Sequence, residues 1–278
     1  MKTVLVCAVL LAAPLGAVTR YVSLDGAHVP PFTSWAAAAT TVHAAVDAAV
    51  SGDEILVSNG VFLLPSPVIV SAAVSIVGWQ GAAATVLDGG LPARSNRCVE
   101  LRHSAAELRG LTLTRGSAPG AELAGCGGAV FCTSGGIVRA CVIAGNHARY
   151  YGGGVGMLMG GLLADCVVSG NVTWGGFLPA GGGIYTLRDT LITNLVVINN
   201  RVQYHGGGIV LGTNAALLAS TVAGNLASNG SGGAVWALAG ARLARCQLRH
   251  NRSAAAGAAL QCAAGVTVEW CLIEYNAS

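Results

Sequence analysis

Two stretches of the sequence nearly repeat each other: "GGGIYTLRDTLITNLVVINN", residues 181–200, and "GGGIVLGTNAALLASTVAGN", residues 206–225. Each begins with three glycines and an aliphatic residue, continues through two short apolar segments and ends on asparagine. Short segments rich in Val, Ile and Leu and separated by glycine are typical of strands, whereas a helix would need an apolar period of 3.6 residues. The two stretches therefore predict an all-β structure built from repeats.

The same pattern recurs in six copies from about residue 127 to residue 278. The final asparagines are separated by 25, 29, 25, 26 and 25 residues, and they are Asn146, Asn171, Asn200, Asn225, Asn251 and Asn276. The aliphatic residue after each glycine cluster keeps the same steps, and the long step contains an insertion, "WGGFLP", residues 174–179. Because one such unit cannot bury its apolar face alone, neighbouring units must stack. A repeat of this length is one turn of a single-chain parallel β-helix.

Stacking aligns equivalent positions in columns with a spacing of about 4.8 Å. The position three residues before each asparagine is always aliphatic, which predicts an inward column. The position five residues before it holds Cys141, Cys166, Leu195, Ser220, Cys246 and Cys271. We interpret these cysteines as buried free thiols that fill the core, with oxidation of adjacent pairs as the alternative. The asparagines predict a structural column, because asparagine tolerates left-handed backbone at turns and stacked amides bond along the axis.

The first residues are typical of a secretory signal. Lys2 precedes the apolar run "TVLVCAVLLAAPL", and "LGA" ending at Ala17 suits cleavage, so residues 1–17 are predicted to be a signal peptide. A membrane anchor is the alternative, although the run is short for a span. No later apolar run is long enough to cross a bilayer. We therefore expect the protein to be secreted or exposed at the cell surface, with no transmembrane segment after the signal peptide.

Residues 18–52 are predicted to cap the stack. The stretch "TVHAAVDAAV", residues 41–50, places Val42, Ala45, Val46 and Ala49 on one helical face, and Gly52 ends the helix. A solenoid needs its open apolar end covered. The β-helix is then predicted to occupy residues 53–278.

Charged residues form only 10% of the chain. Its single lysine lies in the predicted signal peptide, and the arginines are scattered without a basic stripe or interleaved aromatic residues. This distribution argues against nucleic acid as a partner.

The chain resembles a known group of proteins. Its segment "AAVDAAVSGDEILVSNGVF", residues 44–62, resembles the start of secreted right-handed parallel β-helix proteins of the pectin-lyase-like fold. The repeats resemble those of chlamydial polymorphic outer membrane proteins, which carry Gly-Gly-Ala-apolar and Phe-x-x-Asn motifs. Here "GGAV" begins at Gly127 and Gly232, and segments from "IAGN" to "IEYN" match with an aliphatic residue in place of phenylalanine. The resemblance implies a right-handed β-helix, and lyases, hydrolases and adhesins all share this fold.

The sequence ends in "EYNAS", directly after a repeat asparagine. We expect either that the chain is truncated or that something else covers its last turn. Unpaired strand edges at such an end favour association, so end-to-end contact between molecules is predicted there.

Polysaccharide lyases and hydrolases of this fold use acidic clusters, with calcium and a basic residue in lyases or paired carboxylates in hydrolases. The regular repeats contain only four isolated carboxylates: Asp165, Asp189, Glu269 and Glu274. The six histidines lack the spacing of metal ligands. We therefore predict no catalytic residue, no metal and no cofactor, with calcium expected only if the protein is a lyase.

Two groups of residues are predicted to bind a ligand. The position after each repeat aliphatic is aromatic in every second copy, at Phe131, Tyr185 and Trp236. Such a row of exposed rings, about 10 Å apart, suits sugar rings or a surface protein, unless a loop covers it. The segment "ARCQLRHNR", residues 244–252, holds Arg245 and Arg249. These arginines suit an acidic sugar or a phosphate, or form a solvated edge.

The sequence predicts a secreted or cell-surface scaffold with a binding or adhesin-like role and no catalysis. The alternative is a carbohydrate-active enzyme, a lyase or hydrolase of extracellular polysaccharide. A structural spacer within a larger surface assembly is the third hypothesis.

Overall fold

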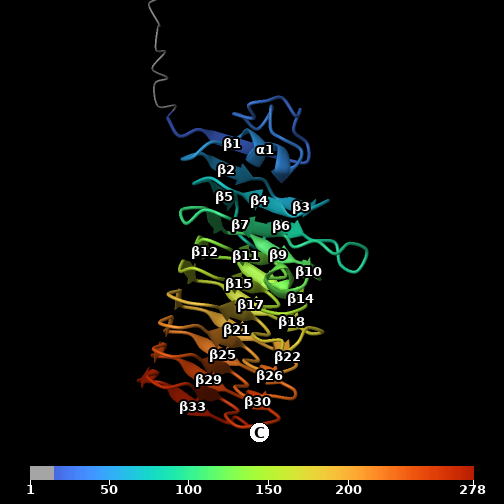
Figure 1. Ribbon diagram of the computed structural model, residues 1–278. Coiled ribbons are helices and arrows are strands. Elements are labelled where there is room, and N and C mark those ends of the chain that lie inside the picture. Colours follow the sequence, from blue (N-terminus) through green and yellow to red (C-terminus); the bar gives the residue numbers. More distant parts are fainter. Residues whose placement is uncertain (1–15) are drawn as a thin grey trace, which may run out of the picture.

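The computed structural model describes residues 16–278, which form one elongated stack of short strands (Figure 1). In each complete turn the chain passes in order through four parallel sheets, of ten, nine, six and eight strands. The stack has about eight turns. The fold is therefore the parallel β-helix that the repeat predicts, with the right hand that the resemblance implies. Each complete turn supplies one strand to each sheet, because the repeat is nearly constant in length.

The strands are named here by sheet. The ten-stranded sheet contains β1 (Thr19–Val22), β2 (Glu54–Val57), β5 (Ser75–Gly78), β8 (Glu107–Arg109), β12 (Ile137–Arg139), β16 (Leu162–Ala164), β20 (Leu191–Thr193), β24 (Ala216–Leu218), β28 (Arg242–Ala244) and β32 (Thr267–Glu269). The nine-stranded sheet contains β3 (Gly60–Leu63), β6 (Thr85–Asp88), β9 (Thr112–Thr114), β13 (Val142–Ala144), β17 (Val167–Ser169), β21 (Val196–Ile198), β25 (Thr221–Ala223), β29 (Gln247–Arg249) and β33 (Leu272–Glu274).

The remaining two sheets form the other side of the stack. The six-stranded sheet contains β10 (Ser117–Ala118), β14 (His147–Ala148), β18 (Val172–Thr173), β22 (Arg201–Val202), β26 (Leu226–Ala227) and β30 (Arg252–Ser253). The eight-stranded sheet contains β4 (Val68–Val70), β7 (Val99–Leu101), β11 (Val130–Cys132), β15 (Val155–Met157), β19 (Ile184–Thr186), β23 (Ile209–Leu211), β27 (Val235–Ala237) and β31 (Leu260–Cys262). Two helices complete the described elements, α1 (Val42–Ala48) and the 3-10 helix η1 (Glu122–Gly125).

The core is built from columns of equivalent residues, whose side chains point inward in every turn. Side chains alternate across a strand, so a three-residue strand sends either its middle residue or its two outer residues inward. In the ten-stranded sheet the middle residue is inward, and this column is fully buried at Leu108, Val138, Leu163, Ile192, Leu217 and Leu243. In the eight-stranded sheet the outer residues are inward, and the middle residue faces outward. This difference exposes the column of Tyr185 and Trp236.

The asparagine column lies inside the stack. Each of the first five asparagines is at most 1% exposed. The Oδ1 atom of each successive asparagine accepts hydrogen bonds of 2.9–3.0 Å from the Nδ2 and the backbone N–H of the preceding one. The second Nδ2 hydrogen goes to a strand carbonyl, as from Asn171 to Ile143 O at 2.9 Å. Buried amides are stable only when satisfied in this way.

The left-handed turn lies one residue earlier than the sequence reasoning placed it. Positive φ angles occur at the position before each asparagine, namely Gly145, Gly170, Asn199, Gly224, His250 and Tyr275. The asparagines themselves have none. The turn residue must project outward, whereas the amide that bonds along the axis must project inward, so one residue cannot do both.

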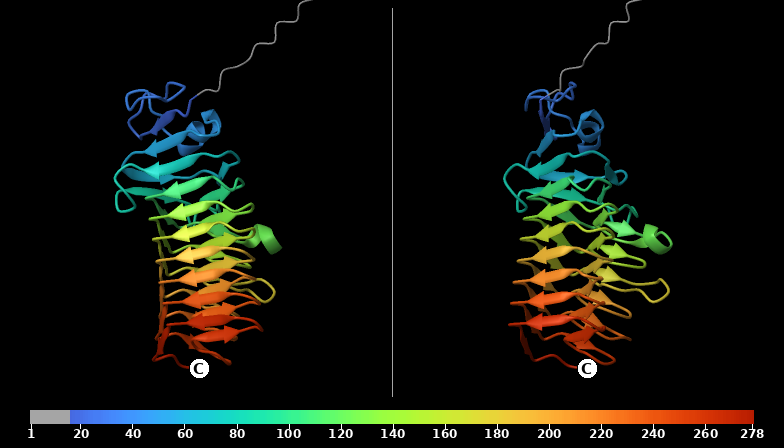
Figure 2. Two further views of the ribbon diagram at one scale, coloured as in Figure 1. Left: turned by 90° about the vertical axis from the view of Figure 1, so that its left-hand side faces the viewer. Right: turned by 60° about the vertical axis from the view of Figure 1, so that its left-hand side comes forward.

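The helix α1 lies at the N-terminal end of the stack (Figure 1). The helix begins after Thr41, whose hydroxyl accepts the N–H of Ala44 at 3.3 Å, and it buries Val42 and Ala45 against the first turn. The first strand, β1, lies within the predicted cap and pairs in parallel with β2. Figure 2 shows this end of the stack at the start of the coloured chain.

The predicted signal peptide falls almost wholly on residues 1–15, outside the described residues. In the part of the chain that the structure describes, no helix is both long and apolar enough to span a membrane. Eight cysteines are described, and all are free thiols. In the column five residues before the asparagines, Cys141, Cys166 and Cys246 are buried as predicted, whereas Cys271 is only half-buried. Burial raises the pKa of Cys98, Cys126 and Cys132 to about 12.

The last turn differs from the others in exposure. Val268 and Ile273 continue columns that are buried in earlier turns, yet they are 42% and 47% exposed. End-to-end association at this end stays a prediction.

Candidate functional site

The predicted row of aromatic residues forms one outward column of the eight-stranded sheet. Strand register aligns Phe131 with Gly156, Gly156 with Tyr185, and Val210 with Trp236. The three rings are therefore two turns apart, as the sequence predicted. Their surroundings, however, differ from one another.

A second column lies beside this row, and two of its members, Tyr151 and His205, carry rings. It occupies the position just before each glycine cluster, and isolated parallel bridges join Cys126, Tyr151, Ala180 and His205. The Tyr151 ring stacks on Tyr185 with centroids 4.7 Å apart, and the His205 ring lies 4.4 Å from that of Trp236. This column was not predicted, although the sequence shows it as the position that precedes each "GG".

Phe131 is buried, so the prediction that its ring belongs to an exposed row is wrong. It is only 6% exposed, because the guanidinium of Arg97 lies 4.7 Å over its ring. Arg97 is held there by hydrogen bonds to the carbonyls of Gly127, at 2.9 Å, and Cys126, at 2.7 Å. Burial lowers the pKa of Arg97, while Glu100 opposes that shift. This arginine fastens the loop before β11 to the stack.

Tyr185 is the centre of an open aromatic site. Together with Tyr150, Tyr151 and Phe177 it lines a surface cavity of about 450 Å³, whose far wall includes Leu123 of η1. Phe177 is 81% exposed and lies in the insertion "WGGFLP". Figure 2 shows η1 and the loop after β18 projecting from the same side of the stack. The helix η1 and the insertion at residues 174–179, which both depart from the regular repeat, thus form walls of one cavity.

The tyrosines of this cavity are neutral hydrogen-bonding groups. Burial raises the pKa of Tyr185 to about 12 and also raises that of Tyr151. Both hydroxyls therefore stay protonated at neutral pH and can donate to a ligand oxygen. We call the surface formed by Tyr150, Tyr151, Trp174, Phe177, Tyr185, His205 and Trp236 the aromatic edge.

Two arginines lie beside the aromatic edge, and one carboxylate, that of Glu122 in η1, lines the cavity around Tyr185. Arg149 lies 5.6 Å over the ring of Tyr150, and Arg201 lies 5.8 Å over the ring of Trp174. The described strands of the six- and eight-stranded sheets beyond residue 127, and the loops that join them, contain no Asp or Glu.

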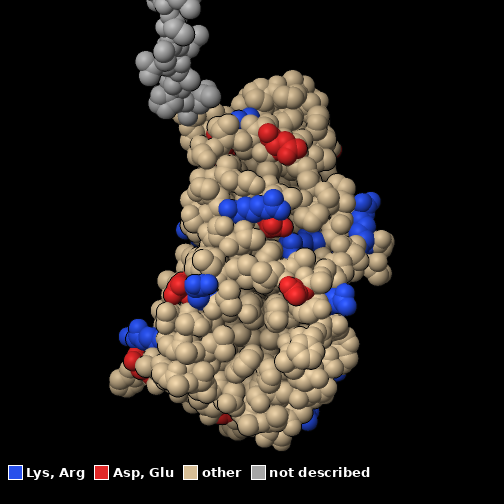
Figure 3. All heavy atoms as spheres, viewed as in Figure 1, with Lys and Arg blue, Asp and Glu red and all other residues tan. Residues whose placement is uncertain are grey.

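Arg245 and Arg249 do not lie on the aromatic edge. Arg245 occupies the corner between β28 and β29, and Arg249 faces outward from β29, paired in register with Glu274. The structure therefore separates the two groups of predicted ligand-binding residues. Figure 3 shows few charged groups in the centre of the lower half of the face seen there, where Figure 1 labels strands of the nine- and six-stranded sheets.

A cluster of ion pairs on the ten-stranded sheet was not predicted. Arg109 bonds Glu54 at 2.9 Å, and Arg139 bonds Glu107 at 2.5 Å, while Arg109 also lies 3.7 Å from Glu107. Glu107 and Arg109 belong to the same strand, β8, whereas Glu54 and Arg139 are far from them in sequence, and only stacking brings these two to the cluster. In the described part of the chain no three His, Cys, Asp or Glu side chains meet in a way that would hold a metal ion.

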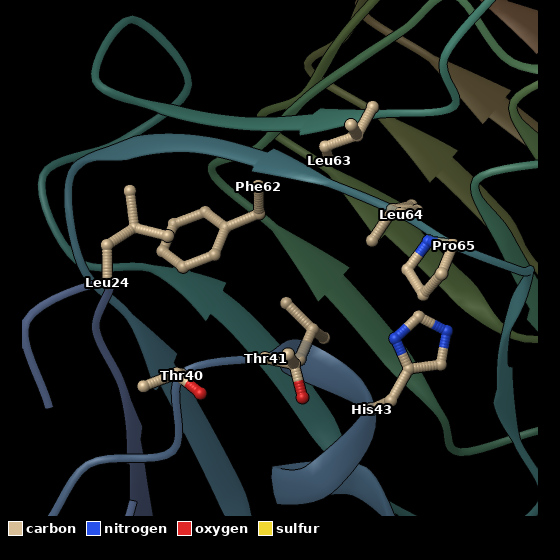
Figure 4. A pocket seen from close by; sticks show the side chains of 9 residues that line it. Leu24, Thr40, Thr41, His43, Phe62, Leu63, Leu64 and Pro65 are labelled. Atoms are coloured by element: carbon tan, nitrogen blue, oxygen red, sulfur yellow. The ribbon is translucent and has the colours of Figure 1, made fainter. Parts of the chain in front are cut away.

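A small pocket lies at the cap. It measures about 50 Å³ and lies between α1 and β3, beside His43 and Phe62 (Figure 4). His43 Nε2 lies 3.0 Å from the carbonyl oxygen of Ser66. This volume accommodates water rather than a substrate.

Comparison with known proteins supports the fold. No protein-family model matches the chain, and no curated protein matches it by sequence. Among solved structures, the pectate lyase Pel9A is similar, with a TM-score of 0.58 and 11% identity over 95% of this chain and 79% of the lyase. A pectin methylesterase from Aspergillus niger has a TM-score of 0.47 and 12% identity, covering 94% of this chain and 87% of the esterase.

Proposed function

We propose that this chain is a secreted or cell-surface carbohydrate-binding β-helix, which holds a polysaccharide along its aromatic edge without cleaving it. The observation that carries the proposal is the open cavity around Tyr185. Sugar rings present apolar faces that pack on aromatic rings, and their hydroxyls accept hydrogen bonds from phenols. The similar fold of a pectate lyase agrees with a carbohydrate ligand.

The elongated shape of the aromatic edge suits a polymer. Tyr185 and Trp236 lie two turns apart, which corresponds to about 10 Å along the axis. A chain that contacts both rings gains from two linked binding events. An adhesin-like role follows if the bound glycan belongs to another cell, and a surface protein is the alternative partner.

Retention on immobilised polysaccharides tests the proposal. Neutral and acidic polysaccharides would be cast into native gels, and the migration of the wild-type chain compared with that of Tyr185→Ala and Phe177→Ala. We expect at least one polysaccharide to retard the wild type. The loss of one stacking ring should weaken that affinity by about tenfold, since such contacts contribute about 1 kcal/mol or more.

Tyr275→Ala provides the matched control, because Tyr275 is 73% exposed but lies outside the aromatic edge. It should be retarded like the wild type. Equal retardation of all three variants would refute the assignment of the site, and absence of retardation by every polysaccharide would refute the function.

A carbohydrate-active enzyme is the second candidate, and the cluster of Glu54, Glu107, Arg109 and Arg139 favours it. Lyases and hydrolases need carboxylates and a basic residue on one surface. In this cluster the charges are paired with each other. A turnover assay with and without calcium, which follows unsaturated products and new reducing ends, tests this function. Cleavage that disappears in Glu107→Gln would replace the binding proposal.

A further inference from the structure

A second cavity lies on the ten-stranded sheet, away from the aromatic edge. It measures about 400 Å³, a volume within the range of small-molecule sites. Its floor is apolar and includes Leu218 and Ala244, while Arg242, Arg245 and Trp270 line it. No residue of the aromatic edge contributes to it.

The backbone directs two of these side chains outward at the same corner. Arg245 and Trp270 are equivalent residues of successive turns, both with left-handed backbone, at φ values of 57° and 55°. Adjacent turns are about 4.8 Å apart, so the guanidinium and the indole are neighbours in one column. Earlier turns place Ala140 and Ala219 at this position, which shows that the corner itself does not require a large side chain.

The charge of the cavity is incompletely balanced. Arg242 forms an ion pair of 2.7 Å with Glu269, the one carboxylate that lines the cavity. Among the described residues, Arg245 has no acidic side chain within 4.0 Å. The cavity therefore carries one net positive charge, and a guanidinium is free to form two hydrogen bonds with a carboxylate or a sulfonate.

The cavity also offers an unusual apolar surface. Trp270 is 87% exposed, although a side chain of this size is normally largely buried in a folded protein. A flat apolar group can stack on the indole while an attached anion reaches Arg245. We infer that this cavity, which we call the Arg245 site, binds a small organic anion with a flat apolar body.

The probe for this inference is 8-anilinonaphthalene-1-sulfonate, which combines a flat apolar body with one negative charge. Fluorescence titration of the whole chain should show binding, and Arg245→Asn and Trp270→Ala should each weaken the affinity by about tenfold or more. Asn and Ala already occupy this corner in other turns, at Asn194 and Ala219, so both variants suit the left-handed backbone.

Arg249→Gln is the matched control, because this exposed arginine lies outside the cavity. It should bind the dye like the wild type, and so should Tyr185→Ala on the aromatic edge. Benzoate should compete with the dye, whereas galacturonate and inorganic phosphate should compete poorly, because neither has a flat apolar body.

Three results would overturn the inference. An equal loss of affinity in Arg245→Asn and Arg249→Gln would indicate general charge attraction. An unchanged affinity in Trp270→Ala would place the dye at the exposed residues of the last turn. Competition by galacturonate as strong as by benzoate would assign the site to an acidic sugar. None of these results depends on whether the aromatic edge binds polysaccharide.

Discussion

Replacing Asn200 by alanine should destabilise the protein strongly, and far more than the same change at Asn276, the last residue of the asparagine column. This residue lies in the middle of the column and is 1% exposed. Its Nδ2 donates to Val168 O at 2.9 Å and to Asn225 Oδ1 at 3.0 Å, and its Oδ1 accepts two bonds from Asn171. Alanine removes all four bonds and supplies none.

The magnitude follows from the groups left without a partner. The backbone N–H of Asn171, one of its Nδ2 hydrogens and the carbonyl of Val168 would be buried and unsatisfied. An orphaned buried group costs about 1–3 kcal/mol, so three of them cost about 3–9 kcal/mol. The loss of a hydrogen bond from the buried asparagine column is severe because the local dielectric is low and each amide bonds to the next. At the end of the column, Asn276 is partly exposed, and water can replace its bonds at a cost of about 1 kcal/mol.

Urea unfolding followed by circular dichroism measures both variants. Asn200→Ala should lower the midpoint strongly and should broaden or split the transition, because turns of a solenoid contact only their neighbours. Asn276→Ala should shift the midpoint slightly, and Asn229→Ala, in an exposed loop, should not shift it. Similar shifts for Asn200→Ala and Asn276→Ala would show that the column does not act as a buried network.

Three further changes test other parts of the fold. The pKa of Asp53 is lowered, because hydrogen bonds from two backbone amides and from Arg20 together outweigh the rise caused by burial. The ionised carboxylate of Asp53 therefore contributes its full stabilisation above the ordinary pKa of about 3.9. This stabilisation is lost as pH falls through the lower pKa of the native state. In urea titrations, Asp53→Asn should lower the free energy of unfolding by about 3 kcal/mol at pH 7 and by much less in acid. A decrease that does not depend on pH would contradict this reasoning. In native chains alkylation should reach the exposed Cys262 first, and mass spectrometry should find Cys98, Cys132 and the other buried thiols unmodified. Gly156→Ala places a Cβ against the sulfur of Cys126, so it should cost about 1–3 kcal/mol, and Cys126→Ala should relieve much of that loss in a double-mutant cycle.

The aromatic column shows how far the repeat alone could predict a site. Constant spacing placed Phe131, Tyr185 and Trp236 in one outward column, and strand register agrees. Spacing along the chain does not report what lies over a column. Arg97 reaches Phe131 from the preceding turn, and only folding brings the two together.

The irregular segments illustrate the same limit. The insertion at residues 174–179 interrupts the period of the sequence, but the side of the stack from which it projects was not predictable. The structure places Phe177 near η1, which begins more than one turn earlier in the chain, and a cavity results. Likewise, Glu54 and Arg109 meet because stacking places their strands, β2 and β8, two turns apart in one sheet.

The sequence by itself determined the architecture, the inward columns and the asparagine column. These features repeat in every turn, so each copy contributes the same local signal, and six copies reinforce one register. Only the tertiary structure decided which outward residues are covered, which arginines are paired and where cavities open. Such contacts join non-equivalent residues of different turns, so their formation depends on side-chain packing that no periodic pattern encodes.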